Sequence, residues 1–72
     1  MWTEQETEIM RDIYRLMKRH ADPKDTVEYW QGLTDDAAAI MRRHDQHDMA
    51  VHFCVAACEY YQDQVWKRKT KA

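Results

Sequence analysis

Residues 20–28 read His-Ala-Asp-Pro-Lys-Asp-Thr-Val-Glu and contain the single proline of the chain, Pro23. The residue before a proline is forced out of the α-helical region, so a preceding helix ends at or before Asp22. Asp25 is followed three residues later by Glu28, a pattern typical of a capping box at a helix start. This stretch therefore separates two helices.

The segment before the break predicts a helix over residues 3–20. Thr3 and Glu6 form another capping-box pattern at its start. Apolar residues then recur every three or four positions, as on one face of an α-helix. This face is formed by Ile9, Ile13, Leu16 and His20, flanked by Met10, Tyr14 and Met17.

The segment after the break predicts a second helix over residues 26–43. Its apolar face consists of Trp30, Leu33, Ala37, Ile40, Met41 and His44. Gly32 weakens such a helix by about 1 kcal/mol relative to alanine. The Thr34-Asp35-Asp36 stretch offers another helix start, so whether Gly32 divides this helix stays open.

Residues 44–48, His-Asp-Gln-His-Asp, contain no apolar side chain and predict a turn. We expect Asp45 or Asp48 to cap a third helix over residues 47–69. Its apolar positions are Val51, Cys54, Val55, Cys58, Tyr61 and Val65, widened by Met49, Phe53, Ala57, Tyr60 and Trp66. This sector is wider than one bundle seam requires, so the helix is either central or contacts a second chain.

Charge follows the same division into three helices. Each predicted helix opens with acidic residues and closes with basic ones, the distribution that the helix dipole favours. We therefore expect an all-α fold, a small three-helix bundle that forms a single domain over residues 1–72. We expect no internal repeat within it.

The apolar residues are unusual in kind. Leu, Ile, Val and Phe number only ten, while five Met, three Trp and four Tyr supply the remaining bulk. Met, Tyr and Trp are enriched in the cores of protein interfaces. A chain of this size buries only about 60% of its unfolded surface. We therefore expect a homo-oligomer, with a two-fold dimer as its simplest form.

Composition also argues against several classes of protein. No run of 18 apolar residues occurs, so we expect no membrane span. Acidic residues near the N-terminus do not fit a signal peptide, which predicts a cytoplasmic location with Cys54 and Cys58 reduced. The net charge of −2 argues against non-specific nucleic-acid binding. The turns also lack the usual glycine of helix-turn-helix proteins, so a DNA-binding regulator is a less favoured interpretation.

Basic side chains gather where the second predicted helix meets the third, beside the N–H groups that open the third helix. Guanidinium groups next to a helix N-terminus suit phosphate, and aromatic rings offer faces on which a base can stack. The predicted ligand site consists of Arg42, Arg43, His44 and His47 together with Trp30, Tyr60 and Tyr61. The alternative is that the arginines only complement the helix dipole while the rings fill the core.

A metal site and an enzyme are less favoured interpretations. On a continuous helix two sets of side chains would converge, His44, Asp48 and His52 in one and His47, Cys54 and Cys58 in the other. We expect neither metal nor cofactor, because reduced cysteines commonly pack as small apolar side chains. Catalysis is not expected either, because the chain has no serine and its two His-Asp pairs lack the further ligands of His-Asp phosphohydrolases.

Three stretches carry a resemblance. They are residues 3–9, Thr-Glu-Gln-Glu-Thr-Glu-Ile, then Glu28-Tyr29-Trp30, and His44-x-x-His47 before the last helix. On these stretches the chain resembles short three-helix proteins of unknown function encoded by phages and prophages of gut Firmicutes. The resemblance implies a small accessory protein in the cytoplasm of an infected host cell. Some phage accessory proteins of this size block a host defence protein, and others trap a nucleotide signal as oligomers.

We therefore expect a non-enzymatic accessory binding protein. The leading hypothesis is an oligomeric counter-defence module that sequesters a small phosphorylated nucleotide. The alternative is a protein–protein inhibitor or adaptor that binds a host defence protein through an exposed Met and aromatic helix face.

Overall fold

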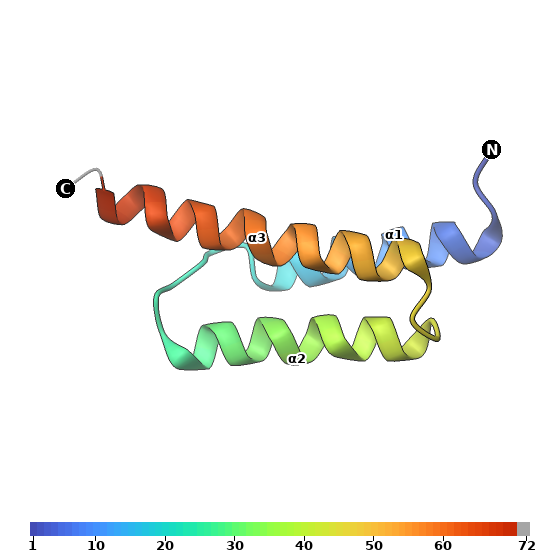
Figure 1. The fold of residues 1–72 in the computed structure, drawn as a ribbon, viewed down its shortest axis with the longest axis horizontal. Coiled ribbons are helices and arrows are strands. Elements are labelled where there is room, and N and C mark those ends of the chain that lie inside the picture. The colour runs from blue at the N-terminus through green and yellow to red at the C-terminus, as the bar shows by residue number, and fades with distance from the viewer. Residues whose placement is uncertain (71–72) are drawn as a thin grey trace.

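The computed structural model describes residues 1–70, so Lys71 and Ala72 of the expected 1–72 domain lie outside the described residues. The chain forms three helices, α1 (Glu4–Arg19), α2 (Val27–Arg43) and α3 (Asp48–Thr70), and residues 1–70 contain no strand. α1 and α3 run in the same direction and α2 runs against both (Figure 1). Each helix packs on the other two. The predicted all-α fold of three helices is confirmed.

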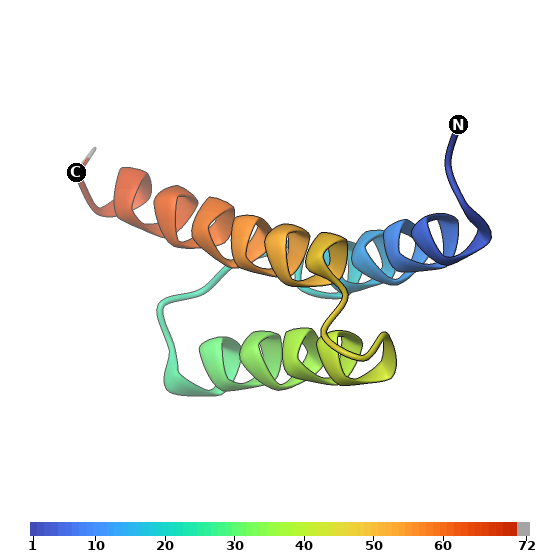
Figure 2. The ribbon, with the colours of Figure 1, turned by 45° about the vertical axis from the view of Figure 1, so that its right-hand side comes forward.

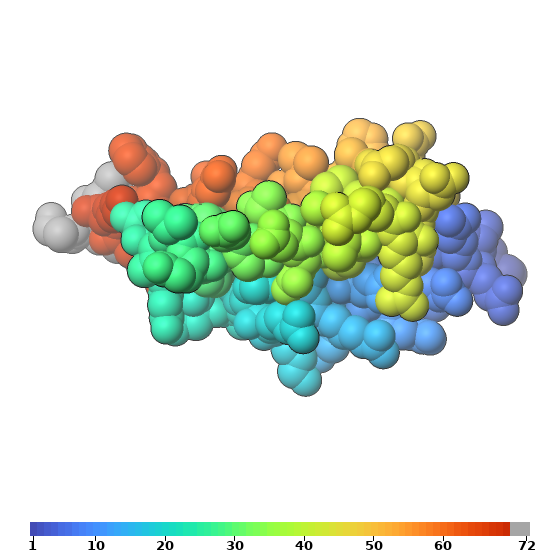
Figure 3. Space-filling model, turned by 90° about the horizontal axis from the view of Figure 1, so that it is seen from below, coloured from blue at the N-terminus to red at the C-terminus, as the bar shows by residue number. Residues whose placement is uncertain are grey.

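Seen from below, α2 runs along the length of the molecule in front of the other two helices, with α3 visible on one side of it and α1 on the other (Figure 3). No helix in the described part of the chain has both the length and the apolar character needed to cross a membrane.

The start of α1 matches the sequence prediction. The Thr3 hydroxyl accepts from the Glu6 N–H at 3.1 Å, and the Glu6 carboxylate accepts from the Thr3 N–H at 2.8 Å. These hydrogen bonds hold the pKa of Glu6 below its ordinary value. The predicted capping box is confirmed.

The start of α2 differs by one residue from the prediction. Thr26, not Asp25, precedes the helix, and its hydroxyl accepts from the Tyr29 N–H at 3.2 Å. Asp25 instead forms an ion pair with Lys69 at the far end of α3. α2 then runs unbroken through Gly32, so this glycine does not divide the helix.

The turn between α2 and α3 uses the two residues after His44 in the left-handed conformation. Asp45 has φ 54° and Gln46 has φ 57°. The N–H of Gln46 donates to the Met41 carbonyl at 2.8 Å, and that of Asp45 donates to the Arg42 carbonyl at 3.1 Å. This is the Schellman pattern, which normally places glycine where Asp45 stands.

The expected cap of α3 by Asp45 or Asp48 is wrong. The N–H of Asp45 donates to the Arg42 carbonyl at the end of α2, so this residue belongs to the C-terminal cap of α2. Asp48 is already the first residue of α3. His47 precedes the helix, and its Nδ1 accepts from the Met49 N–H at 3.1 Å. The His47 ring therefore caps α3, the role that was expected of an aspartate side chain.

The core lies along one seam of each helix. α1 and α2 contribute Ile9, Ile13, Leu16, Leu33 and Ala37, as their periodicity predicts. α3 contributes a seam with coiled-coil-like spacing, formed by Ala50, Cys54, Ala57, Tyr61 and Val65. Val55, expected on this seam, is 48% exposed because it lies on the flank of α3.

Candidate functional site

Two segments, residues 12–20 and 36–44, are related by an internal repeat with an offset of 24 residues. Each begins with aspartate, and they end in Leu-Met-Lys-Arg-His at 16–20 and Ile-Met-Arg-Arg-His at 40–44. The expectation of no internal repeat is therefore wrong. Each Arg-His pair stands at the end of its helix. α1 and α2 are antiparallel (Figure 1), so each pair reaches the aspartate of the other helix.

The first of these contacts, the Asp12 cluster, consists of Asp12, Arg43 and His44. His44 Nε2 lies 2.7 Å from Asp12 Oδ2, and Arg43 donates to Asp12 Oδ1 at 3.4 Å. The Asp12 side chain is only 8% exposed, and that of His44 is 5% exposed. A buried carboxylate requires such partners, since an unpaired charge in the interior is costly.

The second contact, the Asp36 cluster, consists of Asp36, Arg19 and His20. His20 Nε2 lies 2.7 Å from Asp36 Oδ2, and Arg19 donates to the same oxygen at 3.3 Å. The hydrogen bond from His20, assisted by Arg19, holds the pKa of Asp36 below its ordinary value. The Asp36 side chain is 35% exposed, so this cluster is in contact with water.

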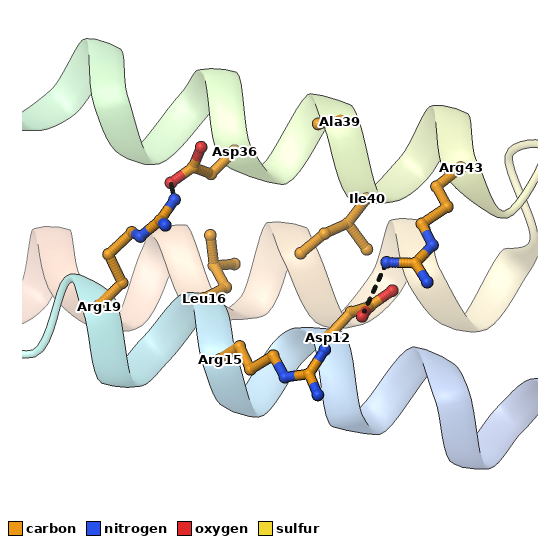
Figure 4. A pocket seen from close by; sticks show the side chains of 8 residues that line it. All are labelled: Asp12, Arg15, Leu16, Arg19, Asp36, Ala39, Ile40 and Arg43. Atoms are coloured by element: carbon orange, nitrogen blue, oxygen red, sulfur yellow. Dashed lines mark hydrogen bonds and ion pairs between the residues drawn. The ribbon is translucent and has the colours of Figure 1, made fainter.

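A groove of about 410 Å³ lies between the two clusters on the outer side of the α1–α2 hairpin. Figure 4 shows Arg19 and Arg43 reaching across it, with Leu16 and Ile40 between them. Its lining consists of Asp12, Arg15, Leu16, Arg19, Asp36, Ala39, Ile40 and Arg43. These residues form four repeat-related pairs, so the groove follows the approximate two-fold axis of the hairpin. Only the pair Arg15 and Ala39 departs from this symmetry.

The groove has an excess of positive charge. Its lining contains three guanidinium groups and two carboxylates, so the net formal charge of these side chains is +1. Arg19 and Arg43 each contact an aspartate through a single nitrogen, so further N–H donors remain open on both. Arg15 is exposed and forms no ion pair or hydrogen bond with another side chain in the described part of the protein. This arrangement can bind an anion over an apolar floor.

The four basic residues of the predicted ligand site do not lie together in the structure. Arg43 lines the groove, whereas Arg42 is exposed outside it. His44 is buried against Asp12, and His47 uses its ring to cap α3. The four residues therefore do not gather beside open N–H groups at the start of α3.

The aromatic half lies toward the opposite end of the bundle. Trp30 is in the first turn of α2, about 20 Å along the helix from Arg43. Tyr61 is buried, and its hydroxyl donates to the Met17 carbonyl at 2.8 Å. Tyr60 is exposed and packs edge-on against Tyr61. These three rings do not border the groove.

The alternative metal sets do not come together either. Among residues 1–70, no three His, Cys, Asp or Glu side chains lie close enough to hold a metal ion. The turn at 45–46 breaks the helical register that would align His44 with His52. Cys54 Sγ instead lies 3.6 Å from the Ala37 carbonyl, and burial raises the pKa of its thiol to about 11. Burial also raises the pKa of Cys58.

Sequence reasoning missed four groove residues, Asp12, Arg15, Arg19 and Asp36. It counted Arg15 and Arg19 among the basic residues that complement the helix dipole, gave Asp12 no role in a site, and considered Asp36 only as part of a second helix start after Gly32. The Asp-x6-Arg-His repeat is the pattern that identifies most of them, because it pairs Asp12 with Asp36 and Arg19 with Arg43. Comparison of the chain with protein-family models, with curated proteins and with solved structures finds no match.

Proposed function

We propose that this chain is a non-enzymatic binding protein that holds a small phosphorylated nucleotide in the α1–α2 groove. The observation that carries the proposal is the presence of three guanidinium groups around one partly apolar groove, with Arg19 and Arg43 at its two ends. A groove of about 410 Å³ also has a size typical of small-molecule sites, which range from roughly 300 to 1,000 Å³.

Phosphate is the anionic group that this groove suits best. Guanidinium groups bind phosphate oxygens through paired N–H donors, and they keep their charge at every physiological pH. The ion pairs with Asp36 and Asp12 hold Arg19 and Arg43 at the two ends of the groove. Arg15, which has no such restraint, can close over a bound phosphate.

The base of the nucleotide is expected on Ala39 and Ile40, the accessible apolar part of the lining. Trp30, Tyr60 and Tyr61, the rings to which the sequence assigned stacking, lie outside the groove and take no part in this proposal. Of the seven ligand-site residues predicted from the sequence, only Arg43 lines the groove proposed here.

The proposed role is sequestration and not turnover. Thiols whose pKa is raised by burial stay protonated at neutral pH, so Cys54 and Cys58 are poor nucleophiles. The resemblance to phage-encoded three-helix proteins supplies the setting, an accessory protein that traps a nucleotide signal in the host cytoplasm.

Calorimetric titration with cyclic mononucleotides, cyclic dinucleotides and ADP-ribose tests the proposal. We expect saturable binding of at least one of them, and we expect Arg15→Ala and Arg43→Ala each to weaken it about tenfold or more, because each variant removes a charged hydrogen bond. Arg42→Ala is the matched control, since it removes the same charge from the neighbouring residue outside the groove.

Two results would overturn the proposal. One is the absence of binding by every nucleotide in the panel. The other is an equal loss of affinity in Arg42→Ala and Arg43→Ala, which would indicate a general charge effect and not a site in the groove.

A further inference from the structure

The two ends of the α1–α2 groove carry arginines in nearly identical settings. Arg19 Nη1 donates to Asp36 Oδ2 at 3.3 Å, and Arg43 Nη1 donates to Asp12 Oδ1 at 3.4 Å. The Arg19 side chain is 73% exposed and that of Arg43 is 65% exposed, although the aspartates that they contact differ in burial. The groove therefore presents two similar anchoring groups to an anion, one at each end.

The internal repeat relates these two ends by an approximate two-fold axis. α1 and α2 run in opposite directions (Figure 2), and the groove residues of 12–20 have their repeat counterparts in 36–44. The axis that exchanges the two helices passes through the groove, between Leu16 and Ile40. A ligand that is itself two-fold symmetric can therefore meet equivalent groups on both sides of this axis.

The spacing of the arginines limits what can contact both of them. In each helix seven residues separate the aspartate from the arginine, which is about 10 Å of helix. Each arginine is held at the aspartate of the other helix, so the two guanidinium groups lie at opposite ends of the groove, roughly this far apart (Figure 4). Charged hydrogen bonds of about 2.8 Å at both ends place the ligand oxygens roughly 5 Å apart. The oxygens of one phosphate are closer together, so one phosphate contacts only one end.

We propose that the groove binds a cyclic dinucleotide, an inference that rests on the nucleotide-binding function proposed above. A cyclic dinucleotide of two identical nucleotides is two-fold symmetric. Its two phosphates are held apart by a ribose on each side of the ring. Placed on the axis of the α1–α2 hairpin, it directs one phosphate to Arg19 and the other to Arg43.

Other phosphorylated nucleotides use this arrangement less fully. A cyclic mononucleotide has one phosphate and engages one arginine at a time. ADP-ribose has two phosphates, but they are adjacent and the groups attached to them differ, so the molecule lacks two-fold symmetry. Only the cyclic dinucleotide among these three classes matches both the separation of the arginines and the symmetry of the groove.

One pair of groove residues makes the two halves of the site differ. Arg15 on α1 corresponds to Ala39 on α2. Ala39 leaves room for a base, whereas Arg15 supplies a further donor to a phosphate of the ligand. The site is therefore nearly symmetric at the two end arginines and asymmetric between them.

Calorimetric titration of the unmodified chain with five ligands tests the inference. They are cyclic di-AMP, cyclic di-GMP, cyclic AMP, cyclic GMP and ADP-ribose. We expect at least one cyclic dinucleotide to bind with a stoichiometry of one per chain. Its affinity should exceed that of the other three ligands by about tenfold or more, because it makes an additional charged hydrogen bond.

Paired variants test the equivalence of the two ends. We expect Arg19→Ala and Arg43→Ala each to weaken binding of the cyclic dinucleotide about tenfold, by similar factors. The same variants should weaken a cyclic mononucleotide only about twofold, because either arginine can hold its single phosphate. Lys18→Ala and Arg42→Ala are the matched controls, since each removes an exposed charge next to one of these arginines but outside the groove. Circular dichroism establishes that each variant is folded.

The possible failures are distinguishable. A cyclic mononucleotide or ADP-ribose that binds as tightly as the cyclic dinucleotides would overturn this inference and leave the proposed nucleotide-binding function intact. A loss of cyclic dinucleotide affinity in only one of the two arginine variants would do the same. Absence of binding by all five ligands would overturn the proposed function and this inference with it.

Discussion

The Asp12 cluster and the Asp36 cluster contain the same three residue types in the same sequence order, yet one is buried and the other is in contact with water. The charge of Asp12 acts on the Cys54 thiol of α3, whereas the groups that act on Asp36 all belong to the end of α1. The same Asp-Arg-His pattern therefore forms a buried contact in one cluster and a contact exposed to water in the other.

Because of this difference in burial, the two ion pairs are expected to contribute differently to the free energy of unfolding. Removing one partner from a buried ion pair leaves an uncompensated polar group and typically costs about 3–5 kcal/mol. An exposed ion pair contributes roughly 0.2–1 kcal/mol, because water competes for both charges. The His–Asp distance is 2.7 Å in both clusters, so the length of this hydrogen bond does not distinguish them, whereas the burial of the two side chains does.

The largest expected effect is that of Asp12→Asn. An amide keeps the size of the carboxyl group but removes the charge that His44 and Arg43 contact, so we expect about 3 kcal/mol less free energy of unfolding. Asp36→Asn is the matched variant in the other cluster and is expected to cost less than about 1 kcal/mol. Urea denaturation of both variants measures the difference, and equal losses would contradict the distinction drawn between the clusters.

The next effect is a pH dependence that belongs to the Asp36 cluster. The pKa of Asp36 is lowered from 3.8, so the folded state favours its charged form. Its contribution to stability is therefore present at neutral pH and is lost as the pH falls below about 4, through the lowered pKa. In acid titrations of unfolding free energy, Asp36→Asn should show a shallower decline below this pH than the unmodified chain. Identical curves would show that the carboxylate does not contribute.

The smallest effect is expected at Gly32, which lies beside the Asp36 cluster. A methyl group added there would meet His20 Cε1 at 3.7 Å, which is an ordinary contact distance. Because alanine also favours the helix, Gly32→Ala should raise the free energy of unfolding by about 0.5–1 kcal/mol. Ala39→Gly on the exposed side of the same helix is the reverse change and should lower it by a similar amount. A loss of stability in Gly32→Ala would mean that His20 cannot tolerate the added contact.

Local sequence patterns predicted the helices to within one residue at each end. The helices were expected over 3–20, 26–43 and 47–69, and both the cap at Thr3 and the break before Pro23 depend only on neighbouring residues. The errors at Asp25 and Asp48 arose where adjacent polar residues compete for one cap, since local pattern does not rank them. Tertiary contacts decide between them, and in the case of Asp25 the contact is with Lys69.

The candidate site was harder to predict because its contacts cross the hairpin. His44 was assigned both to the apolar face of the second helix and to the polar turn, and neither assignment predicts its buried contact with Asp12, 32 residues earlier in the chain. Such a pairing depends on the register between α1 and α2, which helical periodicity within each element does not determine. The repeat contains that information, because equal spacing from Asp12 to His20 and from Asp36 to His44 implies reciprocal contacts in an antiparallel pair.

The 24-residue repeat also creates a problem of folding specificity that α3 resolves. Two copies of α1 placed antiparallel would make the same Asp–His contacts as α1 with α2, so exchange of helices between chains is a competing arrangement. α3 breaks this equivalence, since Cys54 packs closely on the carbonyl of Ala37. The equivalent position in α1 is occupied by the larger Ile13, so α1 in the place of α2 would present a bulkier side chain to α3. Packing on α3, which lies outside the repeat, therefore favours the pairing of α1 with α2 of the same chain over the pairing of two copies of α1 from different chains.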